Sequence, residues 1–137
     1  MPSSAHPEVC VGAVVVHDGA LLLIERGRGA GVGLWSIPGG RVELGETLDA
    51  AVRRELLEET ALVARDAHPI GVVERISDEW HFVIHDFLVT VDDPQPTRAG
   101  DDAAAIEWVP LSEVRSRPGI VPGLVDFLVE NGVLPGQ

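Results

Sequence analysis

The sequence predicts a single domain of the α/β (α+β) class, with a mixed β-sheet sandwiched between helices. The first observation is the order of patterns: strand-like apolar runs, one inserted helical segment, further strand-like runs and a closing helix. The second is composition, because 137 residues, 45% of them hydrophobic and 23% charged, suit one domain with one core. We expect a flexible arm at 1–7, the domain at 8–132 and a tail at 133–137.

The first third of the chain predicts a β-hairpin and a loop. The β-branched run at 8–17 is typical of a strand buried on both faces, near the middle of a sheet. The Asp18-Gly19 pair joins it to a second apolar run, ALLLIER, and predicts a tight turn. The glycine-rich segment 27–33 lacks a following Lys-Ser/Thr pair and a helix, which favours a surface loop over a phosphate-binding loop. A lid over a substrate is the alternative.

The remaining elements follow from caps, breakers and periodicity. A short strand at 34–37 should be stopped by Pro38-Gly39-Gly40, and a helix should begin at residue 48, with Thr47 as its N-cap, and end near Thr60. The other expected elements are strands at 69–77, 80–91 and 103–111, a short helix near 112–116, and a closing helix at 121–132.

Charge and cysteine content limit the classes of partner. A formal net charge of −12 disfavours a nucleic acid polymer as partner, but leaves open a small nucleotide held by metal ions. The single cysteine, Cys10, excludes an intramolecular disulfide. The sequence shows no signal peptide and no apolar run of membrane-spanning length, so we expect a cytoplasmic protein without a membrane partner. A homodimer is left open.

Three glutamates on the inserted helix need a physical explanation. Glu55, Glu58 and Glu59 have the spacing of one helix face, and they lie on or beside the apolar side that should pack. Each unpaired buried charge costs several kcal/mol, and Arg54 can offset only part of that cost. A divalent cation is the simplest missing partner, and oxygen ligands favour Mg²⁺ or Mn²⁺ over zinc. The alternative is a surface helix with an Arg54–Glu58 ion pair.

Such a metal site would suit phosphate chemistry. Mg²⁺ usually binds one or two carboxylates together with substrate phosphates, and it can generate a nucleophile from bound water. A spare carboxylate can accept the proton of that water. The Pro38-Gly39-Gly40 turn brings bare backbone close to the helix, where a glycine carbonyl could add a ligand.

The spacing of these residues resembles the Nudix box, the signature of Nudix (MutT-type) hydrolases. The match comprises Gly40, Glu46 and the segment Arg54-Glu55-Leu56-x-Glu58-Glu59. The resemblance implies the Nudix fold and Mg²⁺- or Mn²⁺-dependent hydrolysis of the pyrophosphate linkage in a nucleoside diphosphate derivative. There is one departure, because the family usually has glycine where this chain has Ala61.

The resemblance also implies roles for individual residues. Glu55, Glu58 and Glu59 match metal-binding carboxylates, and Glu55 matches a position proposed as general base in some members. Arg54 would orient the carboxylates. Glu46 would be a supporting ligand or the partner of Arg54, and the carbonyl of Gly39 or Gly40 would complete the metal shell. In other members the base comes from a later loop, where this chain has Asp101 and Asp102.

Substrate preference is less sharply indicated. The segments HFVIHDFLV and AGDDAAAIEWVPLSEV resemble the ADP-ribose pyrophosphatase-like branch, which favours ADP-ribose or a similar small-molecule nucleotide. A nucleoside triphosphate, including an oxidised one, and a non-catalytic nucleotide sensor are the alternatives. Arg26 and Arg41 are candidates for holding a phosphate, and Trp80 for stacking on a base; ordinary surface charge and core packing are the alternatives for them.

Overall fold

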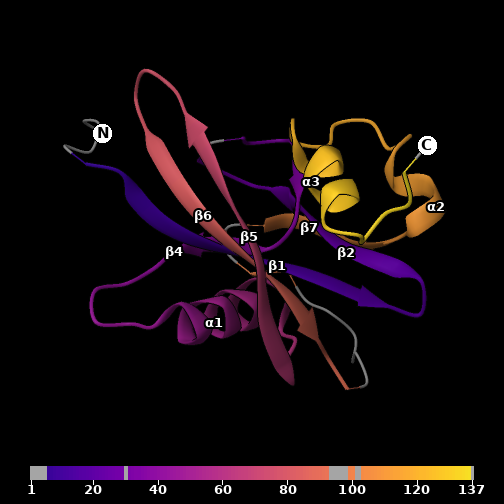
Figure 1. Cartoon of the computed structure of the whole chain (residues 1–137), viewed down its shortest axis with the longest axis horizontal. Helices are drawn as coiled ribbons and strands as arrows, with labels where there is room; N and C mark the ends of the chain where they lie inside the picture. The colour runs from indigo at the N-terminus through magenta and orange to yellow at the C-terminus, as the bar shows by residue number, and fades with distance from the viewer. Residues whose placement is uncertain (1–5, 30, 93–98, 101–102, 137) are drawn as a thin grey trace.

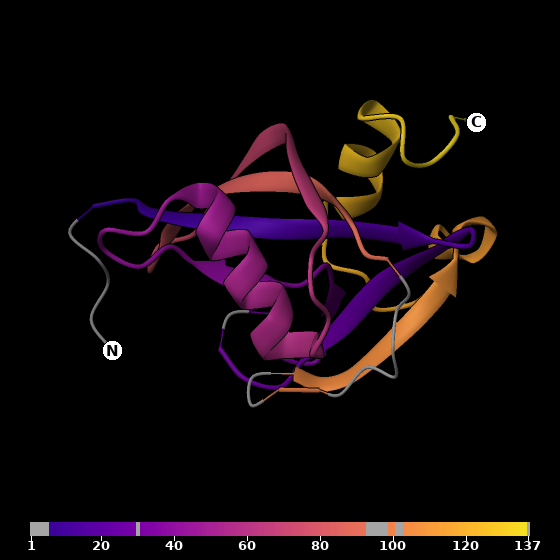
Figure 2. The same cartoon turned by 90° about the horizontal axis from the view of Figure 1, so that it is seen from below.

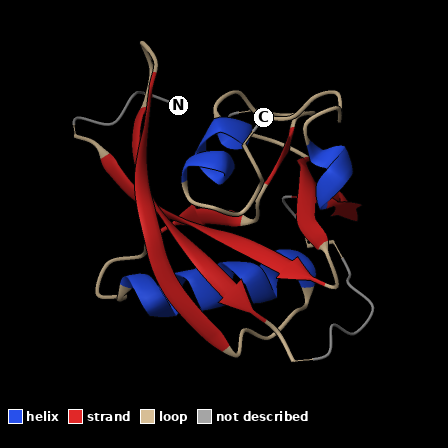
Figure 3. Ribbon diagram, turned by 45° about the vertical axis from the view of Figure 1, so that its right-hand side comes forward, coloured by secondary structure: helices blue, strands red, loops and turns tan. Residues whose placement is uncertain are grey.

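The computed structural model describes residues 6–29, 31–92, 99–100 and 103–136, and it has a mixed sheet lying between helices (Figure 1). Helix α1 covers one face of the sheet, and α2 and α3 lie on the other side (Figure 3). The elements in chain order are β1 (Glu8–His17), β2 (Ala20–Arg26), β3 (Trp35–Ser36), β4 (Gly39–Arg41), α1 (Leu48–Thr60), β5 (Asp66–Ile76), β6 (His81–Thr90), β7 (Ala103–Pro110), α2 (Leu111–Val114) and α3 (Leu124–Glu130).

Strand β1 is the centre of the sheet, as its apolar run predicts. The strand order is β3-β2-β1-β6-β5, with β4 paired to β1 and β7 paired to β2. Strand β1 runs parallel to β6 along one edge, whereas its other edge pairs first with β4 and then with β2, both antiparallel. The turn between β1 and β2 has positive φ at Asp18 and Gly19, which confirms the predicted hairpin.

Two hydrophobic cores lie on opposite faces of this sheet. The first packs α1 against residues such as Val11, Val15 and Phe87, and Figure 2 shows α1 crossing the strands on this side. The second packs α3 and α2 against residues that include Val14 and Leu23. The alternation of side chains along β1 therefore supplies both cores.

Some predicted boundaries differ from the structure. Gly39-Gly40-Arg41 does not only end a strand; it forms β4 by pairing with β1 at Cys10–Gly12. Strand β5 begins at Asp66, three residues earlier than expected, because Pro69 lies on an edge strand where its missing N–H is tolerated. The closing helix is shorter than 121–132, since Pro122 and the left-handed Gly123 precede its first residue.

The C-terminal segment after α3 is partly packed. Asn131 and Gly132 end the helix as predicted, and Gly132 has positive φ. Leu134, which the sequence analysis assigns to a tail at 133–137, is only 2% exposed and belongs to the second core. Helix α1 is the longest helix described, and none in the described ranges is long and apolar enough to cross a membrane.

Helix α1 matches its predicted limits and caps. The Thr47 hydroxyl accepts a hydrogen bond from the Ala50 backbone N–H at 3.1 Å, and the helix ends at Thr60. Ala61 follows in the left-handed conformation, with φ of 67°, and its backbone N–H donates to the Leu57 carbonyl. Alanine thus occupies the conformation that the usual glycine of the box would adopt more easily.

We expect the Ala61→Gly substitution to stabilise the protein by about 1 kcal/mol, because glycine adopts positive φ without the steric penalty of a Cβ. Chemical denaturation would measure the change in free energy of unfolding. The control is Ala50→Gly within α1, which should destabilise by up to about 1 kcal/mol. A loss of stability in both variants would show that the left-handed cap is not strained.

Candidate active site

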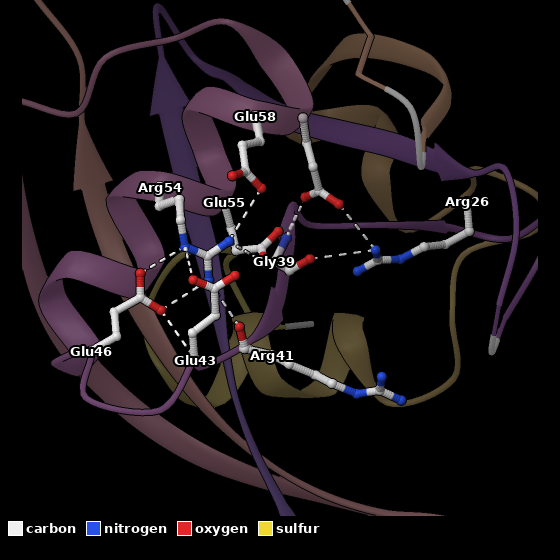
Figure 4. Close-up of polar contacts among 9 residues, drawn as sticks. Arg26, Gly39, Arg41, Glu43, Glu46, Arg54, Glu55 and Glu58 are labelled. Carbon is white, nitrogen blue, oxygen red and sulfur yellow. Dashed lines mark hydrogen bonds and ion pairs between the residues drawn. The ribbon is translucent and has the colours of Figure 1, made fainter. Parts of the chain in front are cut away.

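The guanidinium of Arg54 lies at the centre of the predicted site, where it is hydrogen-bonded to four groups and lies 3.9 Å from a fifth, the carboxylate of Glu43 (Figure 4). Its Nε and Nη2 donate to Glu46 at 2.7 and 2.9 Å, and its Nη1 donates to Glu55 at 3.0 Å and to Glu58 at 3.2 Å. A further bond from Nη2 reaches the Arg41 carbonyl at 3.0 Å and ties the helix to β4. Glu46 is therefore the partner of Arg54, one of the two roles expected for it.

Glu59 lies apart from this cluster, on the side of α1 that faces the sheet. Its side chain is only 5% exposed. Its Oε1 accepts a 2.8 Å hydrogen bond from the Gly39 backbone N–H, and its Oε2 lies 3.3 Å from Nη1 of Arg26. The same Arg26 nitrogen donates to the Gly39 carbonyl at 3.5 Å. Arg26 thus joins β2, β4 and α1 at one point.

The glycines of β4 allow the helix carboxylates to approach the sheet backbone. A Cβ at Gly40 would lie 2.5 Å from Oε2 of Glu55, so a larger residue there would force the Glu55 carboxylate to move. The Glu55 side chain is 14% exposed, whereas that of Glu58 is 58% exposed. The predicted orientation of the acids, with Glu55 and Glu59 inward and Glu58 at the edge, is confirmed.

These environments set the protonation behaviour of the carboxylates. Hydrogen bonds from Arg54 hold the pKa of Glu46 down at about 2, so this group is ionised throughout the neutral range. Burial raises the pKa of Glu55, and the neighbouring Arg54 opposes that shift. A carboxyl group with a raised pKa accepts a proton more readily, which is a property expected of a general base.

The residue types suit a hard divalent cation, because Glu55, Glu58 and Glu59 offer oxygen ligands only. Within the described part of the chain, no three His, Cys, Asp or Glu side chains converge as a preformed metal cluster. The carboxylates are instead bound by the guanidinium groups of Arg54 and Arg26. Positive charge therefore already compensates the acids where the sequence predicts that a cation is needed.

A cavity of ≈ 480 Å³ adjoins this cluster beyond Gly39 and Gly40. This volume lies in the usual range for small-molecule sites. The three residues predicted to bind substrate, Arg26, Arg41 and Trp80, all line it. The structure thus brings them together, although they come from separate segments of the chain.

The rim of the cavity combines aromatic rings with arginines. Trp80 stacks on Phe82 with ring centroids 4.9 Å apart and an interplanar angle of 13°. The guanidinium of Arg41 lies 5.7 Å from the Phe82 ring centroid, and its Nε is 3.0 Å from Glu8. A flat aromatic surface beside positive charge can receive a base and a phosphate.

Among the cavity residues that sequence reasoning missed is Asp86 on β6. It is 4% exposed, and its Oδ1 has no hydrogen-bond partner among the described residues. Burial raises the pKa of Asp86 to about 7, against a smaller opposing effect of Arg75. The available signal was an aspartate inside the apolar run of a central strand, where charged residues are rare unless paired.

The two later candidates for the base, Asp101 and Asp102, lie outside the described residues. The preceding Gly100 is described, and its backbone N–H donates to the Glu59 carbonyl at 3.0 Å. A Cβ at Gly100 would collide with the Glu58 carbonyl. The chain just before these aspartates therefore packs directly on the C-terminal turn of α1.

The free energy of unfolding of the Asp86→Asn variant, compared with that of the wild type at the same pH, should increase as the pH rises from 4 to 8. The wild-type carboxyl has a higher pKa folded (about 7) than unfolded (3.8), so its stabilising effect is complete below pH 3.8 and is lost as pH rises through 7. The relative gain should be on the order of 3–4 kcal/mol. Thermal unfolding over this pH range would measure it. The exposed Asp126→Asn is the control, and equal pH dependence in both variants would contradict the expectation.

Comparisons with known proteins agree on the family. A NUDIX domain model matches residues 6–129. The chain is 34% identical over 111 residues to an ADP-ribose pyrophosphatase of Methanocaldococcus jannaschii, covering 80% of this chain and 65% of that protein. It is 35% identical over 103 residues to an oxidized purine nucleoside triphosphate hydrolase of Danio rerio, covering 74% and 65%. The matches thus span slightly less than two-thirds of the length of these two relatives.

Solved structures show the same fold. The crystal structure of a MutT NUDIX hydrolase from Burkholderia pseudomallei aligns with a TM-score of 0.82 and 30% identity, over 92% of this chain and 98% of that one. A bifunctional NMN adenylyltransferase/ADP ribose pyrophosphatase from Francisella tularensis, complexed with AMP and a manganese ion, aligns with a TM-score of 0.75 and 26% identity, over 91% and 42%. With the box residues gathered around Arg54 and the match spanning nearly the whole domain, the chain belongs to the Nudix family.

Proposed function

We propose that this protein is a Mg²⁺- or Mn²⁺-dependent pyrophosphohydrolase that cleaves the pyrophosphate linkage of a nucleoside diphosphate derivative, ADP-ribose or a similar compound. The observation that carries the proposal is the cluster of Glu55, Glu58 and Arg54 beside a cavity that contains arginines and aromatic rings. The acids match a metal–phosphate site in residue type, and the cavity matches a nucleotide in size and character.

The carboxylates of Glu55, Glu58 and Glu59, with the Gly40 carbonyl, would hold the metal. When bound, the ion supplies charge neutralisation of the phosphates and an activated water. Arg54 holds Glu55 and Glu58 in position through charge-assisted hydrogen bonds. Glu59 is fixed by the Gly39 N–H and Arg26, so its orientation depends on the backbone of β4.

In the proposed reaction the oxygen of water bonds to one phosphorus of the diphosphate, and the bond from that phosphorus to the bridging oxygen breaks. The proton of the water passes to a carboxylate, for which Glu55 is the first candidate because it matches a position proposed as general base in some family members and lies largely buried beside Arg54. The products are a nucleoside monophosphate and a second phosphorylated compound. Arg26 and Arg41 line the cavity, where they suit the phosphates.

Two observations bear on the substrate. The similarity to an ADP-ribose pyrophosphatase supports ADP-ribose, whereas the similarity to an oxidized purine nucleoside triphosphate hydrolase supports the runner-up, a nucleoside triphosphate. Trp80 and Phe82 offer an aromatic surface to either compound. A non-catalytic nucleotide sensor is disfavoured by the presence of all the box carboxylates.

A panel of nucleotides tests the proposal directly. With Mg²⁺ or Mn²⁺, the wild type should release AMP from ADP-ribose, and Glu58→Gln and Glu59→Gln should each lower kcat/KM by at least about 100-fold, because they remove a metal ligand. The matched control is Glu130→Gln at the far end of α3, which should leave activity unchanged. Product release would be followed by chromatography.

Two results would contradict the proposal in different ways. Full turnover in both glutamine variants would exclude these carboxylates as the metal site. Tight binding of ADP-ribose without release of AMP, with either metal, would favour the sensor instead. Faster hydrolysis of a nucleoside triphosphate than of ADP-ribose would select the runner-up substrate.

The identity of the base can be tested separately. If Glu55 accepts the proton, Glu55→Gln should lower kcat by about 10²–10⁴-fold, while Asp101→Asn and Asp102→Asn should have little effect. The dependence of kcat on metal concentration distinguishes a lost base from a lost metal ligand, because excess metal can restore the occupancy of a weakened metal site but cannot replace a base. A large loss confined to an Asp101 or Asp102 variant would move the base to the later loop.

A further inference from the structure

The carboxyl group of Asp86 is an unexplained polar group in the wall of the cavity. Residue Asp86 is only 4% exposed, and the proposed hydrolysis does not use its carboxyl group. Unsatisfied buried oxygens are rare in folded proteins and call for a reason. Asp86 lines the cavity, and its Oδ1 lies against Gly12; a turn of the carboxyl group about the Cβ–Cγ bond would let a ligand in the cavity supply the missing hydrogen bond.

The surroundings of Asp86 are shaped to hold its carboxyl group in place. Gly12 is its register partner on β1, and a Cβ at Gly12 would collide with Oδ1 of Asp86 and lie 3.0 Å from Ile37. The carboxyl group thus occupies the space that a side chain at position 12 would need. On the other side of β1, Gly12 pairs with Gly39, the residue whose N–H binds Glu59.

Asp86 lies at the inner end of a row of side chains on β6. Phe82, Ile84 and Asp86 alternate with residues of the opposite face, and all three line the cavity. Four residues of strand span roughly 13 Å at about 3.3 Å per residue, which is long enough for a nucleoside. The row runs from the aromatic rim at Phe82 to a polar group at its end.

Asp86 differs in charge from the rest of this wall. It is the one carboxyl group among the described lining residues, while Arg26, Arg41 and Arg75 contribute positive charge. Arg75 donates to the Pro122 carbonyl at 2.7 Å, and no ion pair joins it to Asp86 in the described structure. The arginines suit phosphates, so Asp86 is suited to a different, uncharged part of the ligand.

We propose that the carboxyl group of Asp86 recognises the base of the substrate, by pairing with a purine edge that offers a hydrogen-bond donor beside an acceptor. Adenine (6-amino group beside N1) and hypoxanthine (N1–H beside the 6-oxo group) both have this chemistry. The inference rests on the proposed function in taking the ligand to be a nucleotide, and it adds the residue that selects the base.

The chemistry of a buried carboxyl group fits such an edge. In its neutral form the group offers one O–H donor and one carbonyl acceptor, which complement a donor and an acceptor on the base. Burial favours the neutral form, as the raised pKa of Asp86 indicates. Asparagine has the same pair of functions, whereas leucine has neither.

Equilibrium binding without metal tests the proposal independently of hydrolysis. Calorimetry in EDTA would compare AMP, IMP and purine riboside 5′-monophosphate, which lacks the 6-substituent. The wild type should bind AMP or IMP at least about tenfold more tightly than the unsubstituted compound, since an unpaired buried polar group is penalised. Asp86→Asn should keep this preference and Asp86→Leu should lose it. The exposed Asp126→Asn on α3 is the control and should match the wild type.

A second variant moves the carboxyl group without removing it. Gly12→Ala should displace Asp86 and reduce the preference, with thermal unfolding used to confirm that the variant is folded. Equal binding of all three nucleotides by the wild type would overturn the proposal, as would a preserved preference in Asp86→Leu or no binding at millimolar concentration. If binding is selective but no diphosphate is hydrolysed, the proposed function fails and base recognition stands. If a diphosphate is hydrolysed but binding is not selective, the proposed function stands and base recognition fails.

Discussion

The bonding between Arg54 and the acids of α1 is the interaction on which the site depends. Carboxylates packed against a sheet are costly, and a guanidinium that binds Glu46, Glu55 and Glu58 together offsets that cost without filling the space in front of them. Its bond to the Arg41 carbonyl couples this charge balance to β4. The helix can therefore present acids inward only because the adjoining strand contributes backbone groups and glycines.

Strand β4 also has a different part of the proposed site on each of its two sides. On the α1 side, Gly40 makes room for Glu55; on the other side, the cavity extends from Gly39 toward α3. Arg26 and Arg41 line the cavity next to this strand. The carboxylates proposed for hydrolysis and the cavity proposed for substrate recognition thus lie on opposite sides of one short strand. Residues on either side can therefore change while those on the other side are retained.

Most of the fold and the acidic cluster could be predicted from local signals. The apolar run of β1, the Asp18-Gly19 turn and the Thr47 cap each act over a few residues, and the structure confirms them. Strand β4 could not be predicted, because pairing of Gly39–Arg41 with β1 is a tertiary contact that glycine-rich sequence does not signal. Asp86 stands out as an aspartate in an apolar run, but its burial without a hydrogen-bond partner depends on tertiary contacts that this run does not specify.

The close contact between Gly12 and Asp86 has a consequence for how this sequence can change over time. A larger residue at 12 would have to displace the carboxyl group, and a residue much smaller than aspartate at 86 would leave an empty space above a glycine, whereas asparagine at 86 keeps the same volume. The two residues, 74 positions apart in the chain, therefore constrain each other's size. A change of ligand can therefore begin at position 86 with a residue of similar size, whereas a change that begins at position 12 strains the sheet first.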